Sequence, residues 1–152
     1  MTKPEFVYVT YIATTPEKVF HAIVDTDIAQ KYWMGAPGSL ARANYSDWKP
    51  GSRWEHRRVD ESQSVDVVGK VVESEPPRRL VMTWARPAEA DDDTKHSRVT
   101  FDIEQQEPGT VRLTVTHENF EHDPKMLASI SGGWPRVLSN LKTMLEAGRF
   151  PL

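Results

Sequence analysis

Two histidines on predicted strands are the side chains best suited to proton transfer in this sequence. Imidazole titrates near neutral pH, so His56 and His117 are the natural candidates for an acid–base role. Strand residues two apart share a face, which pairs His56 with Trp54 and His117 with Leu113. If Trp54 and Leu113 point inward, both histidines also point inward. A buried histidine is more often a hydrogen-bonded structural residue than a catalyst, which favours the structural role for each.

The tryptophans form the second group of interest, since five occur in 152 residues. Core packing is the simpler interpretation of any one of them, whereas several together favour a cavity lined for a flat or apolar ligand. The residues expected to contact such a ligand are Trp33, Met34, Trp54, His56, Trp84, His117, Met126, Ile130, Trp134 and Leu138.

Several kinds of site are disfavoured by motifs that the sequence lacks. It contains no cysteine, no glycine-rich phosphate loop and no Gly-x-Ser-x-Gly nucleophile motif. The segment 117–122 is rich in metal-ligand types but does not match the His-Glu-x-x-His zinc motif. The acidic run Asp91–Asp93 is interpreted as a solvated loop. We therefore expect no metal, no cofactor and no intrinsic ATPase activity.

Composition and charge fit one globular domain over residues 1–152, with 38% hydrophobic and 27% charged residues. The net charge is −3 and the basic residues are dispersed, which disfavours nucleic acid as a partner. No apolar run is long enough to span a membrane. The segment Met1–Glu5 lacks the apolar core of a secretion signal, so we expect a cytoplasmic location.

The elements that position these side chains begin with a strand and two helices. Phe6–Ile12 is rich in β-branched and aromatic residues and predicts a strand. Thr15 and Pro16 are typical of a helix start, and that helix should end near residues 25–27. A second short helix is expected over Ile28–Trp33, and a loop over Gly35–Asn44.

A run of strands follows, separated by turn residues. The segments that predict strands are Ala43–Trp48, Arg53–Asp60, Val65–Glu73, Arg79–Ala85, Arg98–Gln105 and Thr110–Asn119. Because they are consecutive and joined mostly by short turns, the sheet should be antiparallel.

A long amphipathic helix is expected at the C-terminal end of the chain. Asp123 and Pro124 form a helix start, and Gly148 is a plausible stop. A stripe at helical spacing contains Met126, Leu127, Ile130, Trp134, Val137, Leu138, Leu141 and Leu145. Gly132, Gly133 and Pro135 predict a kink or break. The expected architecture is α+β, with a curled antiparallel sheet of six or seven strands whose concave face this helix covers.

Four stretches resemble the SRPBCC superfamily of START, polyketide cyclase and Bet v 1-like proteins, and within it the branch named after the activator of the Hsp90 ATPase. They are Thr15–Ile23, Trp48–Trp54, Gly69–Glu73 with Pro77–Trp84, and Gly133–Lys142. The resemblance implies a helix-grip fold with a cavity between sheet and long helix, and a lid at the cavity mouth near Trp33 and Met34. It implies no shared set of catalytic residues.

Three functions remain open at this point. The leading hypothesis is a binding module for a small hydrophobic ligand, such as a lipid, a polyketide or an aromatic metabolite. The second is a cyclase- or hydrolase-like enzyme that uses His56 or His117. The third is a cochaperone-like interaction domain, whose partner is another protein or a second copy of the chain.

Overall fold

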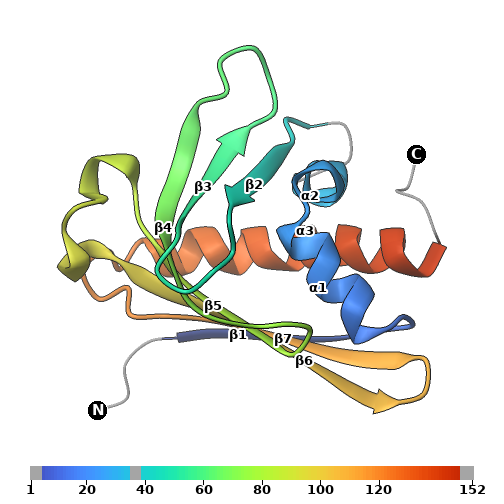
Figure 1. Ribbon diagram of the computed structural model, residues 1–152. Coiled ribbons are helices and arrows are strands. Elements are labelled where there is room, and N and C mark those ends of the chain that lie inside the picture. Colours follow the sequence, from blue (N-terminus) through green and yellow to red (C-terminus); the bar gives the residue numbers. More distant parts are fainter. Residues whose placement is uncertain (1–4, 35–38, 148–152) are drawn as a thin grey trace.

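The computed structural model describes residues 5–34 and 39–147, and its elements follow the expected order (Figure 1). Two short 3-10 helices, η1 (Pro87–Glu89) and η2 (Asp93–Lys95), lie before and at the end of the acidic run Asp91–Asp93, which was predicted to be a solvated loop. The other elements are β1 (Glu5–Ile12), α1 (Pro16–Val24), α2 (Thr26–Tyr32), β2 (Arg42–Ser46), β3 (Arg53–Arg58), β4 (Val65–Glu75), β5 (Arg79–Trp84), β6 (Ser97–Glu107), β7 (Thr110–Glu118) and α3 (Met126–Ala147).

The strands of the described residues form a seven-stranded sheet in the order β1-β7-β6-β5-β4-β3-β2, and all neighbours are antiparallel. The register shifts within the β3–β4, β4–β5 and β6–β7 pairs. Such irregularities bend a strand and increase its twist, which helps a sheet to curve. Figure 1 shows α3 crossing the sheet, with β2, β3 and β4 on one side of it and β1, β6 and β7 on the other. The expected α+β helix-grip architecture is therefore confirmed.

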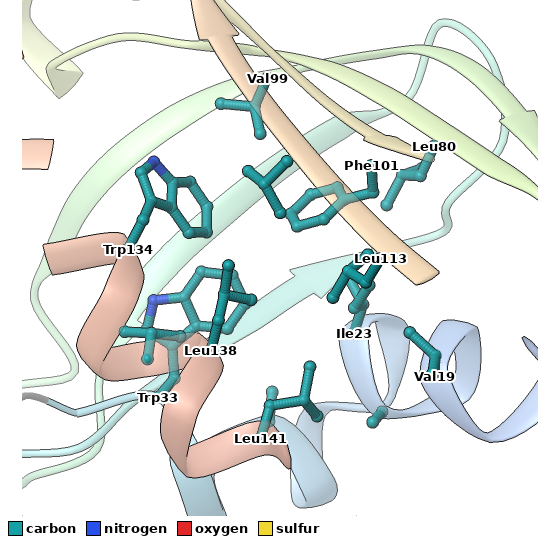
Figure 2. Close-up of a cluster of buried hydrophobic side chains, with 14 of the residues drawn as sticks. Val19, Ile23, Trp33, Leu80, Val99, Phe101, Leu113, Trp134, Leu138 and Leu141 are labelled. Carbon is teal, nitrogen blue, oxygen red and sulfur yellow. The ribbon is translucent and has the colours of Figure 1, made fainter. Parts of the chain in front are cut away.

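The hydrophobic core lies between α3, the sheet and α1. Figure 2 shows Leu138 and Leu141 of α3 facing side chains of the sheet, with Val19 and Ile23 of α1 beside them. Leu141 is fully buried. Alternation along β7 gives the matching sheet surface, because Val111, Leu113, Val115 and His117 are all buried. The period-2 pattern of the strand and the 3.6-residue pattern of the helix thus meet in one core.

Side chains cap the two N-terminal helices. The Thr15 hydroxyl accepts a hydrogen bond from the Lys18 amide, and Pro16 occupies the first helical position, as predicted. The second helix begins at Thr26 rather than Ile28, because the Asp25 carboxylate caps it by accepting from the Ile28 amide at 3.0 Å. The loop expected over Gly35–Asn44 lies partly outside the described residues, and β2 already begins at Arg42.

The long helix differs from expectation at two points. It begins at Met126, because the Asp123 carboxylate forms an ion pair with Arg86 at 2.7 Å in place of a cap. The predicted break is also wrong, since Pro135 lies inside one uninterrupted helix. A Cβ at Gly132 or Gly133 would meet nothing within 4 Å, so neither glycine marks a crowded contact. Buried side chains on both sides of Pro135 hold the helix on the sheet, and such packing outweighs one lost backbone hydrogen bond. Gly148 lies outside the described residues.

Candidate functional site

A cavity of about 510 Å³ lies between the N-terminal half of α3 and strands β3, β4 and β5. It is lined by Trp33, Met34, Arg42, His56, Asp66, Val67, Trp84, Ala85, Arg86, Asp123, Lys125, Met126, Ser129, Ile130, Gly133, Trp134 and Val137. Its volume and its mixture of an aromatic lining with a few polar groups are typical of small-molecule sites.

Three indole rings form the aromatic part of the lining. The ring centroid of Trp134 lies 5.7 Å from that of Trp33 and 5.7 Å from that of Trp84. The Trp33 and Trp134 rings meet edge to face, as Figure 2 shows for the two labelled side chains. These rings come from the end of α2, from β5 and from α3, so the cavity exists only because three elements distant in sequence meet there. Flat aromatic surfaces of this kind suit an apolar or aromatic ligand.

Trp54 does not line the cavity, although it lies in the same aromatic cluster. Its indole Nε1 donates a hydrogen bond of 2.6 Å to the Thr83 carbonyl, and the side chain is fully buried. In the β3–β4 pair Trp54 lies opposite Gly69. A Cβ at Gly69 would overlap the Thr83 carbonyl oxygen and lie 2.5 Å from Nε1. The absence of a side chain at Gly69 therefore lets Trp54 approach the Thr83 carbonyl, and its ring contacts that of Trp84 at 5.5 Å between centroids.

His117 is fully buried and has both ring nitrogens engaged. Its Nδ1 accepts a hydrogen bond from Trp134 Nε1 at 3.2 Å, and its Nε2 contacts Ser97 Oγ at 2.8 Å. The Ser97 hydroxyl donates to the Trp84 carbonyl, so it accepts from a protonated Nε2. Burial lowers the pKa of His117 to about 4. This neutral, doubly bonded imidazole orients Trp134 and does not line the cavity.

His56 is also buried, but it lines the cavity and is held from one side only. Its Nδ1 lies 2.7 Å from the Asn44 carboxamide oxygen. Burial, reinforced by the charge of Arg42 and opposed by Asp66, lowers the pKa of His56 to about 3. The ring is therefore neutral near pH 7 and a weak base. The prediction that both histidines point inward is confirmed, since they are buried together with Trp54 and Leu113 on the same strand faces.

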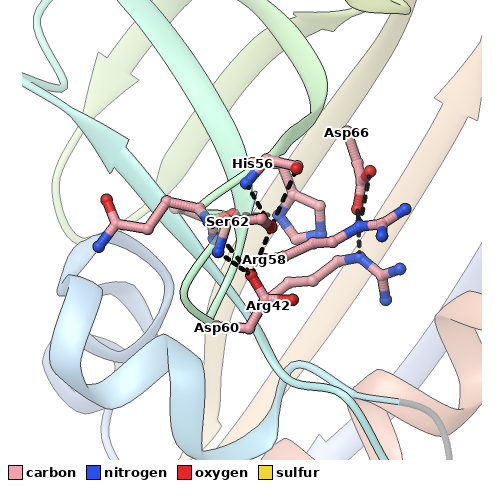
Figure 3. A network of polar contacts seen from close by, with 9 residues as sticks. Arg42, His56, Arg58, Asp60, Ser62 and Asp66 are labelled. Carbon is pink, nitrogen blue, oxygen red and sulfur yellow. Dashed lines mark hydrogen bonds and ion pairs between the residues drawn. The ribbon is translucent and has the colours of Figure 1, made fainter.

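Ion pairs occupy the polar side of the cavity. Figure 3 shows the Asp66 carboxylate facing the guanidinium groups of Arg42 and Arg58, at 2.7 Å and 3.1 Å. Partial burial of Asp66 would raise its pKa, but hydrogen bonds from the two arginines hold the pKa below its usual range. Arg86 pairs with Asp123, which ties the end of β5 to the segment before α3. Arg58 shares the carboxylate of Asp66 with Arg42, and Lys125 also lines the cavity, so cations outnumber carboxylates on this side of the aromatic rings.

The segment that carries Trp33 and Met34 is attached to α3. The Asn140 side-chain nitrogen donates to the carbonyls of Tyr32 and Met34, each at 3.2 Å. The Trp33 carbonyl accepts from the Arg42 amide at the start of β2. The family resemblance implies a lid at this place, and here the segment is anchored on both sides of Trp33.

Seven of the ten residues expected to contact a ligand lie together in the lining: Trp33, Met34, His56, Trp84, Met126, Ile130 and Trp134. Trp54, His117 and Leu138 do not line the cavity: Trp54 and His117 pack against Trp84, and Leu138 packs in the hydrophobic core. Sequence reasoning missed the charged lining residues Arg42, Asp66, Arg86, Asp123 and Lys125. It also missed Ser129, Gly133 and Val137, although these share the helical face of Met126 and Ile130 and could have been found from that spacing. Ligand contact itself stays a prediction for all ten.

Two kinds of feature were not found in the part of the chain that the structure describes. Residues 5–34 and 39–147 contain no group of three or more histidine, aspartate or glutamate side chains placed to hold a metal ion. They also contain no helix that combines the length and the apolarity needed to cross a membrane.

Comparison with known proteins places this geometry in context. Residues 13–146 match the model of a family described as activator of Hsp90 ATPase homolog 1-like protein. No curated protein matches the sequence.

Among solved structures, an Hsp90 activator from Plasmodium falciparum is 20% identical with a TM-score of 0.72, and the match covers 97% of each chain. The Aha1 dimer from Colwellia psychrerythraea is 20% identical with a TM-score of 0.72, covering 95% of this chain and 98% of the other. A protein from Staphylococcus saprophyticus is 23% identical with a TM-score of 0.69, covering 97% and 96%. Likeness at these identities shows the shared fold.

Proposed function

The chain belongs to the family of activator of Hsp90 ATPase homolog 1-like proteins, and on that premise we propose that it is a binding module for a small hydrophobic molecule. The ligand lies in the cavity beneath the N-terminal half of α3, between the indole rings of Trp33, Trp84 and Trp134. The ligand class is an aromatic metabolite or polyketide with a flat apolar body. The observation that carries the proposal is this cavity of about 510 Å³ with its aromatic lining.

The state of the two histidines supports binding over catalysis. A general base works best when its pKa lies near the operating pH. Burial holds the pKa of His56 at about 3 and that of His117 at about 4, and His117 has no free ring nitrogen. Two neutral imidazoles in a hydrophobic layer support orientation of neighbours and of a ligand, and they give little support to acid–base turnover.

The two helix glycines provide the test, because one lines the cavity and the other does not. Gly133 is a lining residue, whereas Gly132 is not, and a Cβ at either meets nothing within 4 Å. Both positions can therefore accept a side chain without a backbone clash. The probe is N-phenyl-1-naphthylamine, whose fluorescence rises in apolar surroundings.

We expect the wild-type protein to bind the probe with a saturable rise in emission. Gly133→Phe should weaken binding at least about tenfold, because the new ring occupies the cavity. Gly132→Phe, the matched control, should bind as the wild type does. Equal binding by the two variants, or no binding by the wild type, would contradict the proposed cavity ligand.

Association with a second copy of the chain is a second candidate function, favoured by the outer face of β1. Val7, Val9 and Tyr11 are 50%, 46% and 52% exposed there, and β1 is an edge strand of the sheet. Exposed apolar edge strands are templates for pairing with another chain. A similar solved protein is a dimer, which agrees with this candidate.

Light scattering coupled to gel filtration tests this association. We expect a dimer for the wild type and a shift to monomer for Val9→Lys, which places a charge in the exposed face. Val72→Lys is the control, since Val72 is exposed on β4, away from that edge. A monomeric wild type would rule out the dimer.

A further inference from the structure

The proton of His56 is fixed on Nδ1 by its neighbours. Asn44 donates through its side-chain nitrogen to the Ile23 carbonyl at 3.3 Å, so its amide oxygen is the atom that faces His56. That oxygen lies 2.7 Å from Nδ1 and can only accept. Asn44 is itself fully buried, and its backbone carbonyl accepts from Thr26 Oγ1 at 2.6 Å. The neutral ring must therefore carry its hydrogen on Nδ1, which leaves Nε2 as a bare acceptor.

This acceptor has no hydrogen-bond partner among the described residues. The neighbours of the ring are aromatic faces and edges: Trp33 lies 5.1 Å away, Trp84 6.0 Å and Trp54 6.2 Å between centroids. Among the described residues, Arg112 Nε is the fully buried side-chain N or O atom that has no hydrogen-bond partner. Nε2 of His56 also has no partner among them, yet it is not among such atoms, so it is not fully buried. Nε2 is thus not sealed inside the protein, and since His56 lines the cavity, Nε2 opens on it. His56 as a whole is only 4% exposed.

The state of Nε2 itself decides which partner it can take. Arg42 and Arg58 share the one carboxylate of Asp66, so this side of the cavity is weakly positive, which opposes protonation of His56 and keeps Nε2 a bare acceptor. A bare acceptor cannot bind an anionic group. A carbonyl oxygen would place its lone pair against the lone pair of Nε2. A hydroxyl group satisfies Nε2 by donating its hydrogen.

We infer that the ligand of this cavity is a hydroxylated aromatic molecule whose phenol- or enol-type hydroxyl donates a hydrogen bond to Nε2 of His56. This inference rests on the proposed binding function and adds the polar group that selects the ligand. The aromatic body lies against Trp84 and Trp134, and the hydroxyl reaches towards β3. The proton stays on the ligand oxygen, because burial keeps the pKa of His56 near 3, far below that of a phenol.

Two probes that differ only in the donor provide the test. 2-Naphthol and 2-methoxynaphthalene share the naphthalene body and the oxygen, but only 2-naphthol can donate. Titration at pH 7, followed by quenching of tryptophan emission, should show 2-naphthol binding roughly five- to tenfold more tightly, the effect of one ordinary hydrogen bond. In His56→Phe, which keeps a ring and removes the acceptor, the two probes should bind equally.

A second measurement on the wild type removes any dependence on how His56→Phe folds. The ¹⁵N resonance of His56 Nε2 should shift on addition of 2-naphthol and stay in place with 2-methoxynaphthalene. Equal affinity of the wild type for both probes, or an unmoved Nε2 resonance at saturation, overturns this inference while the proposed function stands. Failure of N-phenyl-1-naphthylamine and of both naphthalene probes to bind overturns the proposed function, and this inference with it.

Discussion

At the scale of single residues, His56 and His117 occupy equivalent inward positions on their strands and differ in their hydrogen bonds. Both ring nitrogens of His117 are engaged, by Trp134 and by Ser97, whereas Asn44 engages only Nδ1 of His56. The first arrangement fixes an aromatic ring in the lining of the cavity. The second leaves an acceptor on the side of the cavity. Chemically identical side chains therefore support the site in two different ways.

The same burial makes the stability of the protein depend on pH. The pKa of each histidine falls from its usual 6.5 to about 4 for His117 and about 3 for His56. Between pH 6.5 and these values the unfolded chain binds a proton that the folded chain does not, so stability falls as the pH falls. Each histidine should lower the free energy of unfolding by about 2 kcal/mol when the pH falls from 7 to 5.

Urea unfolding at the two pH values measures this loss. His117→Gln should reduce the difference between pH 7 and pH 5 by about 2 kcal/mol, whatever its effect on stability at pH 7. His21→Gln, at an exposed position on α1, is the control and should leave the difference unchanged. A His117→Gln variant with the full wild-type pH dependence would show that His117 is not buried in its neutral form.

Gly69 offers a second test at this scale. Because a Cβ there would overlap the Thr83 carbonyl, Gly69→Ala should displace Trp54 and break its hydrogen bond. We expect a loss of about 2–4 kcal/mol in the free energy of unfolding, as for overpacking combined with a lost buried hydrogen bond. Gly132→Ala, on the open face of α3, should instead be neutral or stabilising. If thermal unfolding gives Gly69→Ala and Gly132→Ala the same stability, a Cβ at Gly69 does not overlap the Thr83 carbonyl.

At the scale of elements, the two halves of α3 have different tasks. The first half, with Met126, Ile130 and Trp134, forms one wall of the cavity. The second half, with Leu138 and Leu141, packs into the solid core against α1 and the sheet. Continuity of the helix across Pro135 keeps the two halves in a fixed relation. The well-packed half can thus hold the cavity wall in place.

Removing a leucine from the packed half tests this division. Leu141→Ala should lower the free energy of unfolding by about 2–5 kcal/mol, as for fully buried leucines generally. Leu40→Ala is the matched control, because Leu40 is 39% exposed, and it should change stability by less than about 0.5 kcal/mol. Chemical denaturation measures both. Similar midpoints for the two variants would mean that α3 does not pack as described.

At the scale of the whole molecule, the family name raises the question of nucleotide binding. The sequence has no glycine-rich phosphate loop, and Arg42 and Arg86 beside the cavity are paired with carboxylates, which leaves the single lysine Lys125. We therefore expect titration calorimetry with Mg-ATP to give no saturable heat, and phosphate release to stay at the buffer rate. Binding of N-phenyl-1-naphthylamine by the same sample is the control for folded protein. Saturable heat from Mg-ATP would reveal a phosphate site that the described residues do not suggest.

Sequence alone determined the elements of this fold and the faces that they bury. Alternation in the strand that carries His117 and the 3.6-residue stripe from Met126 to Leu145 are local signals, because each arises from backbone geometry that neighbouring residues share. Together with consecutive strands and short turns, they were enough to predict an antiparallel sheet covered by a long helix.

The tertiary structure alone decided which inward side chains line the cavity and which lie behind it. Trp54 and His56 share a strand face, yet only His56 lines the cavity, because the Trp54 indole packs beside Gly69 and donates a hydrogen bond to the Thr83 carbonyl. Helix continuity through Pro135 was likewise decided by packing. The physical reason is the same in each case. Periodicity records which side of an element is buried, whereas the space left beside a side chain depends on elements distant in sequence.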